Sequence, residues 1–322
     1  MRFIPSAEQR EFGASVRALI DRADVASVLR ARATGDAAPV RALWRQLAGA
    51  GVTALGTAEK HGGFGADAVD LVIGFTELGR GAVPGPWVES VAVLPGLIAG
   101  SDDEERIAAM AEGEQIATLA APPAAPYAAD ADLADAVYLL DGATLSRARS
   151  GVEHESVDQS RRLVEVRPDA VIATDRDCAA AHDLGALASA AYIRGTGAAL
   201  LDRATEYAKQ RSQFGRAIGS FQAVKHQLAD AIVALELAEP LVFAAALAVR
   251  DDSETRSRDV SAAKVACTDA AYLSARVALQ VHGAIGYTAE YDLALWLTKV
   301  RALVSAWGTQ QQHRDRVLAA LR

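Results

Sequence analysis

A short stretch of the chain, QRSQFGRAIGSFQ at 210–222, interrupts an Ala- and Leu-rich helical pattern with an arginine, an aromatic residue and two glycines. The guanidinium of Arg211 is always charged and can bind a phosphate through two parallel hydrogen bonds. Phe214 could cover an aromatic ring, and the amide of Gln222 is free to form hydrogen bonds. The same residues also fit a structural role, in which Arg211 pairs with an aspartate and Phe214 lies in the core.

A second stretch, QVHGAIGY at 280–287, ends another helical pattern. Gln280 falls at the end of the expected helix, and Gly283 and Gly286 would let another backbone approach the turn closely. By itself this pattern indicates only where a helix stops.

The usual catalytic and nucleotide-binding motifs are missing from the sequence, which has no Walker loop, paired CxxC, HExxH or serine elbow. The segment RGTGAALL at 194–201 begins like a dinucleotide fingerprint, but it lacks the third glycine and a preceding strand. We interpret its glycines as small residues where two helices pack closely. The six histidines show no metal-ligand spacing.

Composition and charge limit the class of protein. The chain has 322 residues, 51% hydrophobic and 23% charged, which is typical of a globular protein with a large core. A net charge of −8 argues against nucleic-acid or anionic-membrane partners, and we expect no membrane span and no signal peptide. Cys178 and Cys267 are isolated, which favours a reducing cytoplasm.

The elements that must position these residues fall into three regions. Residues 1–112 read as helices joined by glycine-rich turns, with Ser6 as an N-cap and a helix stop at Gly49–Gly51. Residues 113–182 have short apolar runs punctuated by Pro, Gly and Asp, which indicates strands. Residues 183–322 predict long helices at roughly 183–211, 219–250, 256–282, 289–300 and 308–321.

In order and spacing, the two stretches resemble the C-terminal domain of the acyl-CoA dehydrogenase family. The arginine–x–x–Phe–Gly corner and its glutamine, the Gln–x–x–Gly turn, and WGTQQQHR at 307–314 carry the resemblance. It implies a mostly α fold, with an N-terminal helical domain, a reduced middle β domain and a C-terminal four-helix bundle. It also implies FAD, held across a subunit contact by Arg211, Gln213, Phe214, Gln222, Gln280, Gly283, Thr309 and Gln311.

The sequence departs from this family where the family carries its base. The usual glutamate position is Trp307, whose indole nitrogen has no basic lone pair. A known alternative position falls on Gly185, which has no side chain. Asp183, His182 or His313 could substitute, the first two only if the alignment shifts by two or three residues. The flavin-ring loop of the family is also missing from 113–182, so we predict no catalytic residue on this chain.

This pattern resembles the short subunit of heteromeric actinobacterial acyl-CoA dehydrogenases that act on steroid-derived CoA thioesters. The resemblance implies a longer catalytic partner in an α2β2 tetramer, an acyl-CoA substrate and an electron-transfer flavoprotein as acceptor. Two alternatives remain open at this point. One is a self-sufficient homo-oligomeric dehydrogenase with an unusual base, and the other is a flavin-free protein that binds acyl-CoA or a protein partner.

Overall fold

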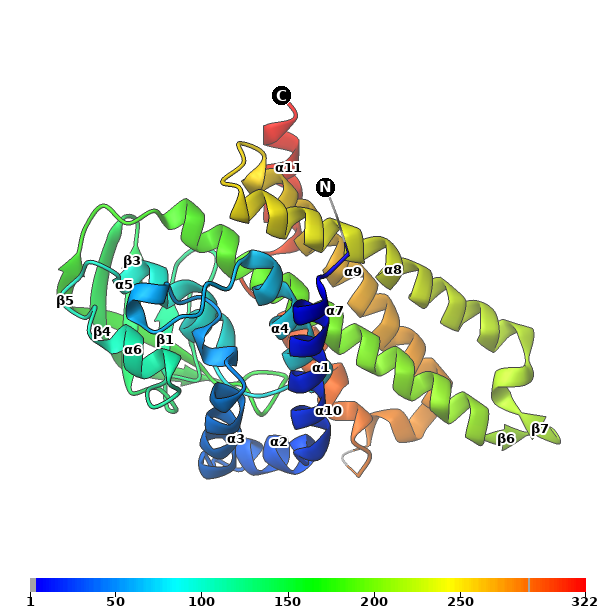
Figure 1. Cartoon of the computed structure of the whole chain (residues 1–322). Coiled ribbons are helices and arrows are strands. Elements are labelled where there is room, and N and C mark those ends of the chain that lie inside the picture. Colours follow the sequence, from blue (N-terminus) through cyan, green and yellow to red (C-terminus); the bar gives the residue numbers. More distant parts are fainter. Residues whose placement is uncertain (1–3, 289) are drawn as a thin grey trace.

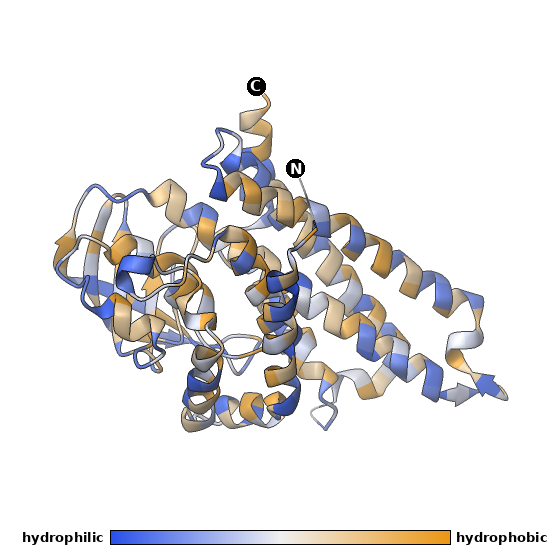
Figure 2. Cartoon of the chain, in the orientation of Figure 1, coloured by the Kyte–Doolittle hydropathy of each residue, from blue (hydrophilic) through white to orange (hydrophobic). Residues whose placement is uncertain are grey.

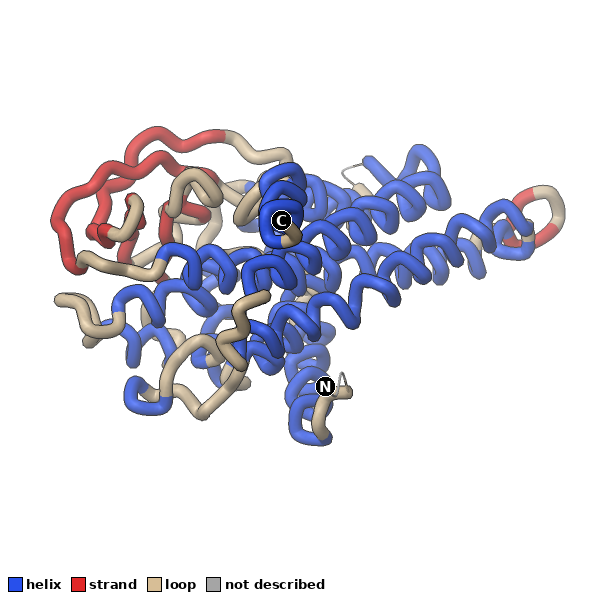
Figure 3. The backbone as a smooth tube through the Cα atoms, turned by 90° about the horizontal axis from the view of Figure 1, so that it is seen from above, coloured by secondary structure: helices blue, strands red, loops and turns tan. Residues whose placement is uncertain are grey.

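The computed structural model describes residues 4–288 and 290–322 of the chain. The chain is elongated, with the main sheet at one end and the small β6–β7 hairpin at the other (Figure 1). Helices fill the space between these ends, as the view from above also shows (Figure 3). The predicted fold class is confirmed, since a helical N-terminal part, a small sheet and a bundle of long C-terminal helices follow one another along the chain.

The N-terminal region is helical, as its sequence predicts. Ser6 caps the first helix, accepting a hydrogen bond from the backbone N–H of Gln9, whose side chain bonds back to Ser6. Gly51 follows the third helix with a left-handed φ of 83°. The helices are α1 (Ala7–Arg22), α2 (Val25–Ala33), α3 (Ala38–Gly49), α4 (Ala68–Arg80), a π-helical segment (Val88–Val93), α5 (Leu94–Ile98) and α6 (Arg106–Ala111).

A five-stranded sheet follows, in the order β1-β3-β4-β5-β2. Its strands are β1 (Ala117–Ala120), β2 (Ala128–Ala129), β3 (Ala136–Asp141), β4 (Thr144–His154) and β5 (Leu163–Ala173). β1 pairs with β3 in parallel, and the other neighbours are antiparallel. β1 is buried along its length, whereas β4 and β5 are largely exposed. The sheet therefore joins the core through β1 and extends into solvent through its long hairpin.

The C-terminal helices are α7 (Cys178–Gln210), α8 (Gln222–Arg250), α9 (Arg256–His282), α10 (Leu293–Leu303) and α11 (Gln310–Ala320). α7 begins earlier than predicted, because Asp177 caps it. Residue 289, in the expected helix 289–300, lies outside the described residues. Between α7 and α8 the chain forms the hairpin of β6 (Ser212–Gln213) and β7 (Arg216–Ala217).

The glycines of 194–201 lie where α7 packs against its neighbours. A Cβ on Gly195 would lie 2.0 Å from the carbonyl oxygen of Thr76, on α4. A Cβ on Gly197 would lie 2.6 Å from Cα of Ala271, on α9. The interpretation of these glycines as close-packing residues is confirmed.

Two of the described helices, α7 and α8, are long and apolar enough to cross a membrane by length and composition alone. The expectation of no membrane span stays a prediction. For α7 the apolar window is 83% buried inside the protein, so its composition reflects a core position. For α8 only 39% of the window is buried, and apolar residues recur along its length (Figure 2). Core helices pass the same test, so the finding is weak evidence for a membrane.

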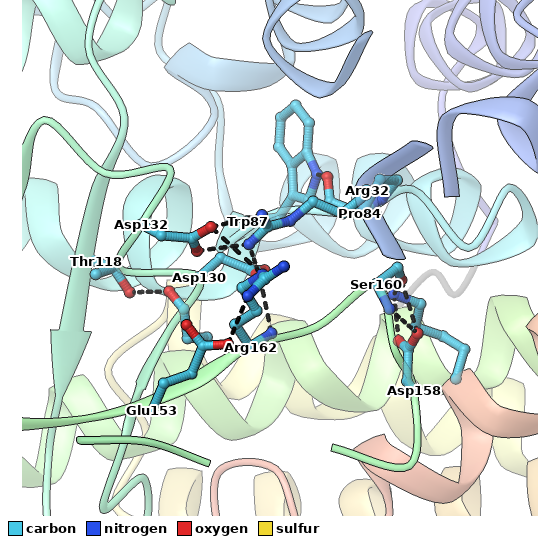
Figure 4. Close-up of polar contacts among 12 residues, drawn as sticks. Arg32, Pro84, Trp87, Thr118, Asp130, Asp132, Glu153, Asp158, Ser160 and Arg162 are labelled. Carbon is cyan, nitrogen blue, oxygen red and sulfur yellow. Dashed lines mark hydrogen bonds and ion pairs between the residues drawn. The ribbon is translucent and has the colours of Figure 1, made fainter. Parts of the chain in front are cut away.

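Buried ion pairs tie the middle region to the two helical regions (Figure 4). Arg32 of α2 is fully buried and bonds to Asp130 at 3.0 Å and to Asp132 at 2.6 Å. Lys299 of α10 pairs with Asp158 at 2.6 Å, and both side chains are 5% exposed. Removing one partner of such a pair leaves an uncompensated buried charge, which typically costs several kcal/mol. These pairs hold the segments that carry Asp130, Asp132 and Asp158 against α2 and α10.

Candidate functional site: an exposed hairpin and a filled base position

The hairpin between α7 and α8 presents the residues of the first sequence stretch to solvent. Phe214 is 93% exposed and has a left-handed φ of 53°. Its ring meets that of Phe221 edge-on, with centroids 6.3 Å apart. Arg211 and Gln213 are exposed, and Arg211 forms no ion pair with any of the described residues. The structural alternative, with a core phenylalanine and a salt-bridged arginine, is therefore wrong.

Three more of the predicted residues lie at the same end of the molecule. Gln222 is the first residue of α8, directly after the hairpin. Gln280 and Gly283 flank the end of α9, where the His282 ring stacks on Tyr207 of α7 with centroids 4.2 Å apart. Gly283 has a left-handed φ of 66°, and a Cβ there would meet no atom within 4 Å. We call the six residues Arg211, Gln213, Phe214, Gln222, Gln280 and Gly283 the tip.

Thr309 and Gln311 do not belong to the tip. Thr309 caps α11, accepting a hydrogen bond from the backbone N–H of Gln312. Gln311 is exposed and donates a hydrogen bond from Nε2 to Asp315 at 2.8 Å. Both side chains have partners on their own helix, and their cofactor role stays a prediction.

Trp307, which the sequence predicts at the position of the usual base, is buried. The residue is 2% exposed and has a left-handed φ of 57°. Its indole Nε1 donates a hydrogen bond to Oε1 of Glu89 at 2.9 Å. A Cβ built on Gly185 would lie 2.2 Å from Cε3 of the indole. The two positions that could carry a base are therefore interlocked: the ring of one occupies the space that a side chain at the other would need.

The substitute bases considered from the sequence are poorly placed for proton abstraction. Asp183 is fully buried and accepts hydrogen bonds from Arg256 at 3.0 Å and from Arg316 at 2.6 Å. The rings of His182 and His313 stack with centroids 5.5 Å apart. Burial lowers the pKa of each histidine to about 4, which makes both weak bases near neutral pH.

Glu89 is a buried carboxyl that the sequence analysis did not single out. It lies on the π-helical segment Val88–Val93, a geometry often found at functional sites. Burial raises its pKa, against the opposing effects of the Arg161 charge and the hydrogen bond from Trp307. A lone carboxylate in the apolar run WVESVAVL is the signal that could have identified it.

Two cavities meet at Trp307. One, of about 250 Å³, lies between Glu89, Tyr127, Arg161 and the indole, and we call it the Arg161 cavity. The other, of about 530 Å³, is mostly apolar and opens beside Cys178 and His182. Four residues line both cavities: Pro123, Ala124, Trp307 and Gln312.

The fold defines the class of protein. Butyryl-CoA dehydrogenase of Megasphaera elsdenii superposes with a TM-score of 0.86 at 20% identity, over 100% of both chains. The ChsE4-ChsE5 complex of Mycobacterium tuberculosis gives 0.86 at 21% identity, over 100% of this chain and 99% of that chain. The Tcur3481-Tcur3483 steroid ACAD gives 0.87 at 21% identity, over 98% and 97%. All three share the acyl-CoA dehydrogenase fold.

Sequence comparison then shows the family. The acyl-CoA dehydrogenase N-terminal domain matches residues 6–114, and the C-terminal domain matches 180–322. Acyl-CoA dehydrogenase IpdE2 of Mycobacterium tuberculosis is 31% identical over 299 residues, 92% of this chain and 91% of that protein. IpdE2 of Mycolicibacterium smegmatis is 31% identical over 319 residues, 97% and 99% of the two chains. The chain belongs to the acyl-CoA dehydrogenase family of flavin-dependent oxidoreductases.

Proposed function

We propose that this chain is the partner subunit of a heteromeric, FAD-dependent acyl-CoA dehydrogenase. It contacts the flavin of a longer subunit and supplies no catalytic base. One observation carries the proposal: the tip is exposed, and Arg211 forms no ion pair with the described residues, whereas Trp307, packed against Gly185, occupies the position predicted for the base. A site that served this chain alone would need a proton-abstracting group at that position.

The residues of the tip fit an adenine dinucleotide held by another chain. Arg211 offers a free guanidinium for the pyrophosphate, and the exposed face of Phe214 can cover the adenine. Gln213, Gln222 and Gln280 supply amides that can donate or accept hydrogen bonds. The chemistry that FAD supplies in such an enzyme is acceptance of a hydride from the acyl thioester.

The open face of α8 fits a contact with the longer subunit. Four large apolar side chains of this helix are 42–66% exposed: Ile232, Val233, Leu237 and Leu241. A contiguous apolar face of this kind commonly marks a protein contact, which agrees with an α2β2 assembly.

The ChsE4-ChsE5 complex and the Tcur3481-Tcur3483 steroid ACAD support a heteromeric assembly and a steroid-type acyl-CoA substrate for this chain. We extend the proposal to an electron-transfer flavoprotein as the electron acceptor. The place of action in this proposal is the cytoplasm, where Cys178 and Cys267 stay reduced.

The test is the FAD content of the co-purified complex after gel filtration. Arg211→Ala removes a charge-assisted contact of about 1.5–3 kcal/mol, so FAD should be retained roughly ten- to a hundredfold less tightly. Arg211→Lys should recover part of this, because an ammonium cannot bridge two phosphate oxygens as the guanidinium does.

The matched control is Arg167→Ala. Arg167 is an equally exposed arginine on β5, at the opposite end of the molecule (Figure 1). It should leave FAD retention unchanged. If Arg211→Ala retains FAD as the control does, while the complex stays intact, the tip does not hold the flavin and the proposal fails.

A further inference from the structure

Arg161 is a partly exposed arginine that lines both the Arg161 cavity and a smaller neighbouring space of about 40 Å³. Across the described ranges 4–288 and 290–322, its guanidinium forms no hydrogen bond or ion pair. A guanidinium carries five N–H donors in a fixed fork. Because no described side chain occupies them, the donors of Arg161 are open to a ligand in the cavity that this residue lines.

The nearby carboxyl groups do not fill that role. Asp158, three residues earlier, pairs with Lys299 at 2.6 Å. Glu89 accepts its hydrogen bond from Trp307 and forms no ion pair with any described residue. Burial raises the pKa of Glu89, so its carboxyl is protonated more readily than an exposed one. In the protonated form it can donate a hydrogen bond beside the guanidinium.

The rest of the Arg161 cavity is suited to a small amphipathic molecule. Its walls include the apolar groups of Pro123, Ala124 and Leu163, the indole of Trp307 and the phenol of Tyr127. Ser305, Thr309 and Gln312 add polar groups to the lining. A cavity that combines apolar walls with convergent polar groups is suited to a molecule with one polar and one apolar end. The volume of about 250 Å³ equals that of roughly eight waters at about 30 Å³ each, enough for a short-chain acid.

We propose that the Arg161 cavity binds a small monocarboxylate, whose carboxylate pairs with Arg161 and whose short apolar body lies against Trp307 and Pro123. A carboxylate matches a single guanidinium through two parallel hydrogen bonds. A phosphate dianion would bring a second charge, and among the described residues Arg161 is the one cationic residue in the lining of the cavity. The lining shares no residue with the tip, so the two sites can be tested with different variants.

The test is calorimetric titration of the purified chain at pH 7 with hexanoate, hexanamide and inorganic phosphate. Hexanoate should bind saturably, and hexanamide and phosphate at least tenfold more weakly. Arg161→Gln should weaken hexanoate binding at least tenfold, and Arg161→Lys should lose less. Arg167→Gln, on the exposed strand β5, should bind hexanoate like the wild type.

The proposal is overturned if the wild type shows no saturable hexanoate binding, or if hexanamide or phosphate binds as well as hexanoate. It is also overturned if Arg161→Gln, with an unchanged melting temperature, binds hexanoate normally. Should Arg161→Gln fail to fold, the comparison of Arg161→Lys with the wild type decides. The FAD content of the co-purified complex is a separate measurement with Arg211 variants, so failure of the proposed function and failure of this proposal are distinguishable.

Discussion

The contact between Trp307 and Gly185 joins the two positions at which the family resemblance predicts a base. The indole occupies the space above the glycine, and its Nε1 is held by Glu89 at 2.9 Å. A hydrogen bond from a buried indole to a buried carboxyl fixes the ring in one orientation. The space beside Gly185 is therefore filled by a ring that is held in one orientation.

Gly185→Ala should destabilise the protein by about 1–3 kcal/mol or more, because its methyl group would lie 2.2 Å from the indole ring. Urea unfolding measures the change. Gly96→Ala is the control, since a Cβ there meets no atom within 4 Å, and it should be neutral or slightly stabilising. Combining Gly185→Ala with Trp307→Ala should recover part of the loss, because the two sites are coupled. An unchanged urea midpoint for Gly185→Ala would contradict the interlock.

At the scale of elements, the start of α7 and the start of α11 are joined by two uncharged histidines. His182 and His313 stack at 5.5 Å with ring planes 10° apart. The groups around them are Asp183 and Arg316, with Lys264 facing from α9. Burial keeps both rings neutral, so protonation must work against this packing.

Protein stability should therefore fall as the pH is lowered below neutrality. The unfolded histidines have a pKa near 6.5 and the folded ones near 4, so the unfolded state binds more protons between these values. The stabilisation is complete above about pH 6.5 and is lost progressively toward pH 4. Each ring should contribute a loss on the order of 2 kcal/mol between pH 7 and 5.

The measurement is the urea midpoint of the wild type and of His182→Phe at pH 7 and pH 5. Phenylalanine keeps an aromatic ring but cannot titrate, so the variant should lose less stability on acidification than the wild type. His226→Phe, at an exposed position on α8, should behave like the wild type. Equal losses for His182→Phe and the wild type would show that this ring does not drive the acid sensitivity.

Most elements could be predicted because their signals are local. The capping box at Ser6 and the left-handed Gly51 are set by neighbouring residues, and both are found. The hairpin β6–β7 was expected only as a corner, since strands of two residues carry no periodic pattern. The predicted domain boundaries, at 112/113 and 182/183, stay predictions.

The candidate site could be predicted only in part, for the same reason. The tip and the Trp307 position follow from the spacing of the family's motifs. Glu89 and Arg161 belong to no motif, and they lie 72 residues apart in the sequence. Their roles depend on contacts between distant segments. The hydrogen bond from Trp307 to Glu89, for example, spans a sequence separation of 218. The burial that raises the pKa of Glu89 is likewise a property of the folded chain.

At the scale of the whole molecule, the open face of α8 and the tip belong to the same end of an elongated chain (Figure 1). A single partner could cover both surfaces. Apolar burial along α8 would supply most of the association free energy, and the tip would add the contact to a bound cofactor. Assembly and flavin retention should therefore respond to different mutations.

Leu237→Glu should weaken association with the longer subunit at least tenfold, because it places an unpaired charge in a desolvated contact. Leu237 is 66% exposed, so the fold of the free chain should be unaffected. Val171→Glu is the control, a 60% exposed position on β5 at the other end of the molecule. Sedimentation of the mixed subunits measures the change. Normal assembly of Leu237→Glu would show that α8 is not the contact.

The Trp307–Gly185 contact also ties the two positions to each other in evolution. Any L-residue with a Cβ at 185 would clash with the indole, so glycine is required at 185 for as long as tryptophan stands at 307. Replacement of the tryptophan has a cost of its own, because a glutamate at 307 would leave a void above Gly185 and set a second carboxylate beside Glu89. Single substitutions at either position therefore pass through impaired intermediates, and the packing itself resists the arrival of a carboxylate at this place.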